Sequence, residues 1–248
     1  MIAAITAGGR VAGELAAALG TDVKALARVG NRTLLEAAVA AAREAGAARI
    51  VVVGGAEVRA HCAGRVDLVV AESSDGRENL RRALEAAQGD ALLLSTSDLP
   101  FVDGAAVRAF LAACGDADVA LPLARADDYE RAYPGAPPHV TRVGRERVAN
   151  GSVVYFAPGV APRMLDVATR LFAARKSLLR MASLLGPALL ARFDVPDAER
   201  AEREARAQTV LGLRARAVRD ASPALCYDID TLADYAYAVA RAASAPGA

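Results

Sequence analysis

Residues that could bind a nucleotide and a metal ion follow three apolar runs of the chain. The first run, Ile2 to Thr6, is followed by a glycine turn and a lysine: Ala7, Gly8, Gly9, Arg10 and Lys24. Two glycines allow the backbone to approach a ligand closely, and the two basic side chains could pair with phosphates. A plain structural turn explains the same glycines. The segment is neither a dinucleotide fingerprint, which would need glycine at position 10, nor a P-loop.

An aspartate follows the second apolar run, Ala91 to Leu94, within the sequence Ser95-Thr96-Ser97-Asp98-Leu99-Pro100. If both runs are parallel strands, Asp98 lies at the same edge of the sheet as Gly8 and Gly9, where open sheets bind ligands. A carboxylate at that edge can hold Mg²⁺, which takes one or two carboxylates plus phosphate and water. The alternative is an aspartate that caps the following turn.

Two further aspartates, Asp228 and Asp230, end the third run, Leu225 to Ile229, which the pattern predicts as a strand. Residues two apart lie on the same face of a strand, so both carboxylates would point the same way. Both could belong to the same metal site as Asp98. Alternatively, Asp230 caps the last helix through the amides of its first turn.

Apolar runs alternate with helical patterns along the chain. The expected strands cover 2–6, 50–53, 68–70, 91–94, 119–121, 153–156, 214–218 and 225–229, and the expected helices 33–45, 79–87, 104–113, 163–185, 198–211 and 231–243. This alternation predicts an α/β fold, with a mostly parallel twisted sheet between two helical layers. We expect one domain over 1–244, rather than two small ones, and a disordered tail at 245–248.

The segment from Ala124 to Asn150 breaks this rhythm. It is polar, contains three prolines, and carries Arg142, Arg145 and Arg147 together with Tyr129 and Tyr133. Long connections inside compact domains are usually functional or disordered. We expect an insertion on the acceptor side of the site; an oligomer-forming flap is the alternative.

The composition disfavours several classes of partner. The formal net charge is +1 and tryptophan is absent, so we expect no nucleic-acid partner. No uncharged run of about 20 apolar residues occurs, so we expect no membrane span. Cys62, Cys114 and Cys226 are dispersed, which indicates reduced thiols and a cytoplasmic protein. The only histidines, His61 and His139, offer too few ligands for a common zinc site, and neither is expected to take part in catalysis.

Taken together, the segments resemble the nucleotidyltransferases of the molybdenum-cofactor guanylyltransferase type, whose superfamily includes cytidylyl- and uridylyltransferases. The shared motifs are a glycine turn after the first strand, a lysine ahead of a Leu-Leu-Glu helix, an Asp-x-Pro and a closing Asp-x-Asp-Thr. Here they read Ile5-Thr6-Ala7-Gly8-Gly9, Lys24 with Leu34-Leu35-Glu36, Asp98-Leu99-Pro100, and Asp228-Ile229-Asp230-Thr231. The chain departs from the family after Gly9, where an Arg-Met pair is usual and Val11 to Leu15 stands instead.

The resemblance implies a fold of the nucleotide-diphospho-sugar transferase (glycosyltransferase-A) type and a role for each matching residue. Asp98 and Asp230 would hold Mg²⁺ or Mn²⁺, with Asp228 as a further partner. Lys24, which we expect to be exposed on a loop, would bind phosphates. The nucleotide would lie against the remaining positions: Ala7, Gly8, Gly9, Arg10 and, near the base or ribose, Asn79.

The reaction implied is transfer of a nucleotidyl group from an NTP to a small phosphorylated acceptor, with release of pyrophosphate. The acceptor phosphate would meet basic side chains that could equally form a solvated face: Arg142, Arg145, Arg147, Arg175 and Lys176. A glycosyltransferase of related fold and a nucleotide-binding protein without catalysis are the alternatives. The sequence is also compatible with a homo-oligomer.

Overall fold

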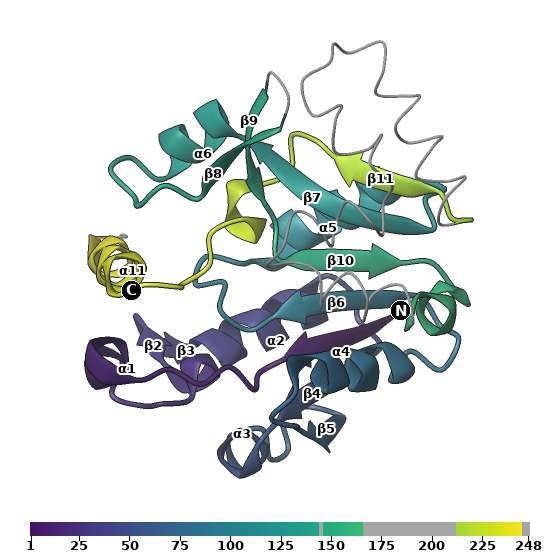
Figure 1. Cartoon of the computed structure of the whole chain (residues 1–248), viewed down its shortest axis with the longest axis horizontal. Coiled ribbons are helices and arrows are strands. Elements are labelled where there is room, and N and C mark those ends of the chain that lie inside the picture. Colours follow the sequence, from purple (N-terminus) through teal and green to yellow (C-terminus); the bar gives the residue numbers. More distant parts are fainter. Residues whose placement is uncertain (144–145, 166–211, 245–248) are drawn as a thin grey trace.

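The computed structural model describes residues 1–143, 146–165 and 212–244, drawn in colour in Figure 1. In these residues one nine-stranded mixed sheet has the order β5-β4-β1-β6-β10-β7-β9-β8, with β11 also paired to β7. The strands are β1 (Ile2–Thr6), β4 (Arg49–Gly54), β5 (Leu68–Ala71), β6 (Leu92–Thr96), β7 (Val119–Arg125), β8 (Val140–Val143), β9 (Glu146–Asn150), β10 (Val153–Phe156) and β11 (Ala215–Val218). A separate pair, β2 (Arg28–Val29) and β3 (Arg32–Thr33), lies outside it.

The helices of the described residues are short to medium in length. They are α1 (Gly13–Leu19), α2 (Leu34–Glu44), α3 (Ala56–His61), α4 (Gly76–Glu85), α5 (Gly104–Cys114), α6 (Ala126–Ala132) and α11 (Leu232–Ser244), with single 3₁₀ turns η1 (Lys24–Leu26) and η3 (Pro223–Leu225). Residues 160–165 are also helical. Polar residues fix several starts: Thr33 and Glu36 form a capping box on α2, and the Asp75 and Asp103 side chains cap α4 and α5.

The first half of the sheet is parallel, as the uninterrupted apolar runs predict. β5, β4, β1 and β6 run in one direction, whereas β10 is antiparallel to both β6 and β7. Thr6 pairs with Val53 on one side and Thr96 on the other. The carboxyl ends of β1, β4 and β6 therefore meet at one edge of the sheet.

Helices cover both faces of the sheet (Figure 1). Alternate side chains of each strand point to opposite faces. Ile5 and Val52 pack against α2 and α5 in one core cluster, whereas Val51 and Val53 pack against α4 in the other. The expected three-layer α/β fold is confirmed, and its two cores hold the loops at the carboxyl edge in place.

Residues 124–150 extend the sheet and do not form the long polar loop that we expected. β7 continues to Arg125, α6 follows, and β8 and β9 form a hairpin whose second strand pairs with β7. The prolines are confined to the connection between α6 and β8. Tyr129 and Tyr133 are buried in the core and do not face solvent. One side of the segment is apolar. Its few apolar residues are spaced too irregularly for the sequence pattern to predict that side.

The predicted strand from Leu225 to Ile229 is wrong. Pro223–Leu225 form η3, and the chain that follows has no regular structure. Leu225, Tyr227 and Ile229 are fully buried, which explains the apolar pattern without a strand. Single backbone bonds fasten the segment instead: Ser152 N–H donates to the Leu225 carbonyl, and Ile229 N–H donates to the Asp98 carbonyl.

The other expected strands are confirmed, as are the helices at 33–45, 79–87, 104–113 and 231–243, with ends shifted by a few residues. The sequence did not predict α1, α3, α6 or the β8–β9 hairpin. The expected helix at 163–185 beyond Leu165, the helix at 198–211 and the disordered tail at 245–248 lie outside the described residues. None of the helices in the described ranges combines the length and apolar character needed to cross a bilayer.

Candidate active site

A cavity of about 630 Å³ opens at the carboxyl ends of β1 and β6. Ligands of open α/β sheets bind at this edge, and the volume lies in the usual range for small-molecule sites. The residues that line the cavity come from the glycine turn, η1, α4, β6, the β9–β10 junction and the loop before α11. They are Thr6, Gly8, Gly9, Lys24, Gly76, Asn79, Leu80, Leu94, Ser95, Thr96, Ser97, Asp98, Gly151, Ser152, Val154 and Asp230.

Lys24 joins two of the predicted metal ligands. Its Nζ lies 2.6 Å from Asp98 Oδ2 and 2.8 Å from Asp230 Oδ1. Only 13% of the Lys24 side chain is exposed, so the expectation of an exposed loop lysine is wrong. Burial lowers the pKa of Lys24, but attraction to Asp98 and bonds to both carboxylates outweigh it, and the pKa lies above its ordinary value. Lys24 therefore carries a full positive charge between two carboxylates.

The same two carboxylates, together with Asp228, could hold a divalent cation. One ligand oxygen from each of Asp98, Asp228 and Asp230 lies within 4.8 Å of the other two. Asp98 Oδ1 is buried and has no hydrogen-bond partner among the described residues. Three carboxylates around the single ammonium of Lys24 leave two formal negative charges. An all-oxygen donor set with this charge fits Mg²⁺ or Mn²⁺.

Asp228 and Asp230 reach the site from a fixed loop and not from a strand. Ile229 is buried between them and bonds to the Asp98 backbone, so the two carboxylates flank a point anchored to the end of β6. The alternative role of Asp230 as helix cap is not what the structure shows. Asp234 Oδ2 accepts bonds from Thr231 N–H at 2.7 Å and Asp230 N–H at 3.1 Å, which leaves the Asp230 carboxylate directed to Lys24.

His139 is part of the site, although the sequence analysis excluded it. Its Nδ1 lies 3.0 Å from Asp228 Oδ1 and its Nε2 lies 2.8 Å from Asp234 Oδ1. The hydrogen bond to Asp228 raises the pKa of His139 to about 9 against the opposing effect of burial, and the bond to Asp234 adds to the rise. Burial raises the pKa of Asp228, but the bond from His139 outweighs it, so that pKa lies below its usual value. The only feature of the sequence that could have pointed to His139 is that the chain has just two histidines.

The glycine turn lines the cavity with its backbone. A Cβ on Gly8 would lie 2.2 Å from Glu72 Oε2, so a side chain there would displace the Glu72 carboxylate. Gly9 has more room, since its nearest neighbour would be Lys24 Cβ at 3.8 Å. Ala7 is buried and does not line the cavity; its N–H donates to the Val53 carbonyl.

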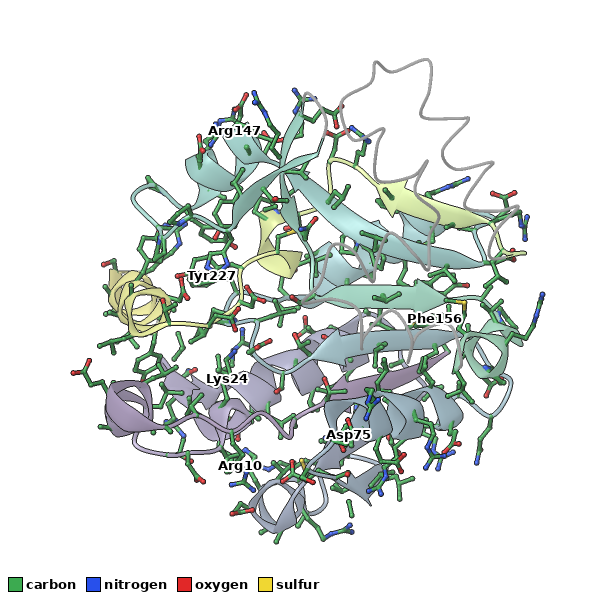
Figure 2. The ribbon with its side chains drawn as sticks, viewed as in Figure 1. Arg10, Lys24, Asp75, Arg147, Phe156 and Tyr227 are labelled. Carbon is green, nitrogen blue, oxygen red and sulfur yellow. The ribbon has the colours of Figure 1, made fainter. Side chains whose placement is uncertain are left out.

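Arg10 does not line the cavity. Its guanidinium pairs with Asp22 at 3.2 Å and with Glu57 and Glu72 at 3.1 Å each. Bonds to Glu57 and then Glu72 raise the pKa of Arg10 above its ordinary value. Figure 2 shows Arg10 toward α3, with Lys24 nearer the centre of the molecule. The Arg10 guanidinium, which the sequence analysis assigned to phosphate binding, is therefore already paired with three carboxylates.

Asn79 lines the cavity and also shapes the loop beside it. Its Oδ1 accepts from Ser73 N–H at 2.6 Å, and its Nδ2 donates to the Ser73 carbonyl at 2.9 Å. Both polar groups of the amide are thus engaged with the backbone after β5. Asn79 holds this loop next to Gly8, which is compatible with its expected place near the base or ribose.

Of the basic residues expected on the acceptor side, the two that the structure describes, Arg142 and Arg147, do not line this cavity. Arg147 pairs with Glu130 at 2.6 Å and lines a separate hollow of about 480 Å³, formed by the paired strands β7 and β9 and the residues after β11. Figure 2 shows it at the far end of the hairpin from Lys24. Arg142 is exposed on β8. Arg145, Arg175 and Lys176 lie outside the described residues.

Comparisons with known proteins agree with this fold. The family model of the MobA-like NTP transferase domain matches residues 3–218. A hypothetical transferase from Thermus thermophilus is 28% identical, with a TM-score of 0.79 over 94% of this chain and 98% of that chain. No curated protein sequence gives a significant match.

Two more distant structures share the fold. The 2-C-methyl-D-erythritol 4-phosphate cytidylyltransferase, also from Thermus thermophilus, is 20% identical, with a TM-score of 0.53 over 97% of this chain and 98% of that chain. The manganese complex of Rv0371C from Mycobacterium tuberculosis H37Rv is 19% identical, with a TM-score of 0.53 over 96% and 97%. At these identities the similarity concerns the fold alone. The family model spans most of the chain and confirms the resemblance seen in its motifs: the chain belongs to the MobA-like NTP transferase domain family and is an enzyme of the nucleotidyltransferase class.

Proposed function

We propose that the enzyme transfers a nucleotidyl group from an NTP to a small phosphorylated acceptor and releases pyrophosphate, with Mg²⁺ or Mn²⁺ as cofactor. The observation that carries this proposal is the placement of Lys24 between Asp98 and Asp230 at the edge of the cavity. A triphosphate bound with a metal ion needs a positive charge, carboxylates and accessible backbone close together. Lys24, the aspartates and the glycine turn offer these three features. A cytidylyltransferase and a manganese-bound protein share the fold, which supports the same chemistry here.

The residues that line the cavity divide the work between binding and charge neutralisation. Gly8 and Gly9 offer backbone to the nucleotide, and Asn79 holds the loop that closes this side. Lys24 binds phosphate oxygens. The carboxylates of Asp98, Asp228 and Asp230 would hold the cation, which would supply positive charge to the reacting phosphates.

In the proposed reaction, an oxygen of the acceptor phosphate forms a bond to the α-phosphorus of the NTP. The bond from that phosphorus to the oxygen it shares with the β-phosphorus breaks, and pyrophosphate leaves with the electron pair. The attacking phosphate is already anionic, so no side chain needs to remove a proton. The protein therefore contributes alignment of the two substrates and the positive charge of Lys24.

The acceptor side of the cavity lies opposite the glycine turn, at Ser97, Gly151 and Ser152. Residues 124–150 adjoin this side, because β9 leads directly into Gly151 and His139 contacts Asp228. We therefore assign acceptor selection to this part of the chain. Arg147 is not assigned to that role, since it is paired with Glu130.

A cytoplasmic location fits the same picture. Cys62, Cys114 and Cys226 are all free and buried, as is usual for proteins of reducing compartments. The substrates proposed here are also metabolites of the cell interior.

The test is a thermal-shift screen of the four common NTPs with and without Mg²⁺ or Mn²⁺, followed by assays with phosphorylated small molecules. A bound ligand raises the melting temperature by mass action. We expect one NTP to do so only with the metal, and turnover to release pyrophosphate. Release of a nucleoside diphosphate from a nucleotide-sugar would indicate the glycosyltransferase alternative. NTP binding without turnover of any acceptor would indicate a binding protein.

A further inference from the structure

His139 lies between two carboxylates that are both remote from it in the sequence. Its two ring nitrogens face Asp228 at 3.0 Å and Asp234 at 2.8 Å. Only 15% of the His139 side chain and 2% of the Asp234 side chain are exposed, so solvent cannot easily replace either bond. The ring comes from the connection between α6 and β8, whereas both carboxylates come from the last third of the chain.

Asp234 is itself held in place. Its Oδ2 accepts from the N–H groups of Asp230 and Thr231 and from the Thr231 hydroxyl, which together fix the start of α11. The Tyr227 hydroxyl donates to the Asp234 carbonyl at 2.9 Å. Asp234 is therefore a fixed point from which His139 can hold a second group.

That second group is the Asp228 carboxylate of the cation site, which His139 and Ser152 hold from its two oxygens. Its Oδ1 faces His139 and its Oδ2 accepts from the Ser152 hydroxyl at 3.2 Å. Asp98 and Asp230 lie within 4.8 Å and carry the same sign of charge. Repulsion from them would turn Asp228 away if the bond from His139 were lost.

The rings around His139 limit its movement. The centroid of the Tyr227 ring lies 5.1 Å from that of His139, and the centroid of the Tyr129 ring lies 6.1 Å away. Both tyrosines are buried. Close packing on these sides keeps the imidazole in the orientation that faces both carboxylates.

We propose that His139 is a positioning residue, which holds the Asp228 carboxylate in the orientation required for cation binding and so connects residues 124–150 to the metal site. This inference rests on the proposed function. His139 itself contributes no ligand atom, because both of its ring nitrogens are bound to carboxylates. Partners of ligating carboxylates commonly change metal affinity by about 10–100-fold when they are replaced.

Two substitutions separate the two bonds of His139. In His139→Asn the amide nitrogen lies where Nδ1 was, so it can still donate to Asp228 but cannot reach Asp234. In His139→Gln the amide lies where Nε2 was, so it can donate to Asp234 but leaves Asp228 unsupported. Both variants lose one buried bond, so we expect similar losses of thermal stability. Binding of Mn²⁺ alone, measured by electron paramagnetic resonance, reports on the cation site without any turnover.

We expect His139→Gln to weaken Mn²⁺ binding by at least about tenfold and His139→Asn to stay within about threefold of the wild type. The matched control is His61→Gln, because His61 also lies beside a carboxylate, 3.4 Å from Glu36, but Glu36 is not one of the three carboxylates of the cation site. It should leave Mn²⁺ affinity unchanged. Equal weakening in both His139 variants, or none in His139→Gln, overturns the positioning role alone. A wild-type protein that binds no Mn²⁺ overturns the proposed metal site and this inference with it.

Discussion

Replacing Lys24 by Met tests the central contact of the site, because it removes the ammonium and keeps most of the side-chain length. The ammonium lies 2.6 Å from Asp98, whose side chain is only 16% exposed, and 2.8 Å from Asp230, which is 67% exposed. Breaking a largely buried ion pair costs about 3 kcal/mol, whereas the exposed half contributes less than about 1 kcal/mol. At about 2–4 °C per kcal/mol for a chain of this size, the melting temperature should fall by about 6–12 °C without metal.

The same substitution should strengthen cation binding. Lys24 occupies the space between Asp98 and Asp230, and without its charge these two carboxylates face each other with no cation between them. Mn²⁺ should therefore raise the melting temperature of Lys24→Met more than that of the wild type, and calorimetry should show tighter binding. Turnover should nevertheless fall by about 10²–10³-fold, because a positive charge on the phosphates is lost.

Arg10→Met is the control for this experiment. Arg10 also lies among three carboxylates, but it does not line the cavity. Its loss should leave Mn²⁺ affinity unchanged. If Lys24→Met binds Mn²⁺ no more tightly than the wild type, Lys24 and the cation do not share the carboxylates, and the assignment of the cation site is wrong.

Three further predictions concern the site and the core. Asp98→Asn and Asp230→Asn should each lower metal-dependent pyrophosphate release by about 100-fold or more at an unchanged circular dichroism spectrum, and two near-normal rates would exclude them as ligands. Gly151→Ala should lower the free energy of unfolding by about 1–3 kcal/mol in urea titrations, since its Cβ would lie 2.3 Å from Pro122 Cγ; an unchanged midpoint would contradict this. Burial raises the pKa of Cys114 from 9.0 to about 11, so the unfolded chain loses that proton first and stability should fall as pH rises from 9 toward 11. The fall should be smaller in Cys114→Ala.

The parallel half of the fold could be predicted because its strands are buried on both faces. Such strands read as unbroken apolar runs, and the runs at 50–53 and 91–94 form parts of β4 and β6. Glycines and polar residues at the ends of these runs also marked the loops that meet at the carboxyl edge. The position of Asp98 at this edge follows from one rule, that parallel strands have their carboxyl ends at the same edge of the sheet.

Apolar runs did not predict strands correctly where a buried segment is unpaired or where a paired segment is exposed. The run from Leu225 to Ile229 is apolar because its side chains fill the core, but its backbone bonds go to single groups at Ser152 and Asp98. Conversely, β8 and β9 form a hairpin although much of their surface is polar and exposed. An apolar pattern reports burial, and only contacts remote in the chain decide whether a buried segment joins a sheet.

The partners of the site residues were harder to predict than their positions. The motifs suggested Lys24, Asp98 and Asp230 as one group, but not that the lysine would be buried between the two aspartates. His139 bonds to a carboxylate 95 residues further along the chain. The spacing of neighbouring residues cannot predict such a contact. A single histidine in a polar segment also forms no periodic pattern from which its burial could be predicted. Arg10 shows the opposite error, since its three acidic partners come from two loops and the first turn of α3, which no motif connects.

The position of Lys24 links cation binding to phosphate binding in the proposed reaction. While Asp98 and Asp230 hold the ammonium, Lys24 is neutralised and a triphosphate would meet a site of net negative charge. Lys24 becomes free to pair with phosphate oxygens only when another positive charge satisfies the two carboxylates. An NTP that arrives with its divalent cation would bring both exchange partners at once: the carboxylates would gain the metal, and Lys24 would gain the phosphates. Neither the cation alone nor the metal-free nucleotide provides both, so we expect each to bind more weakly than the two together.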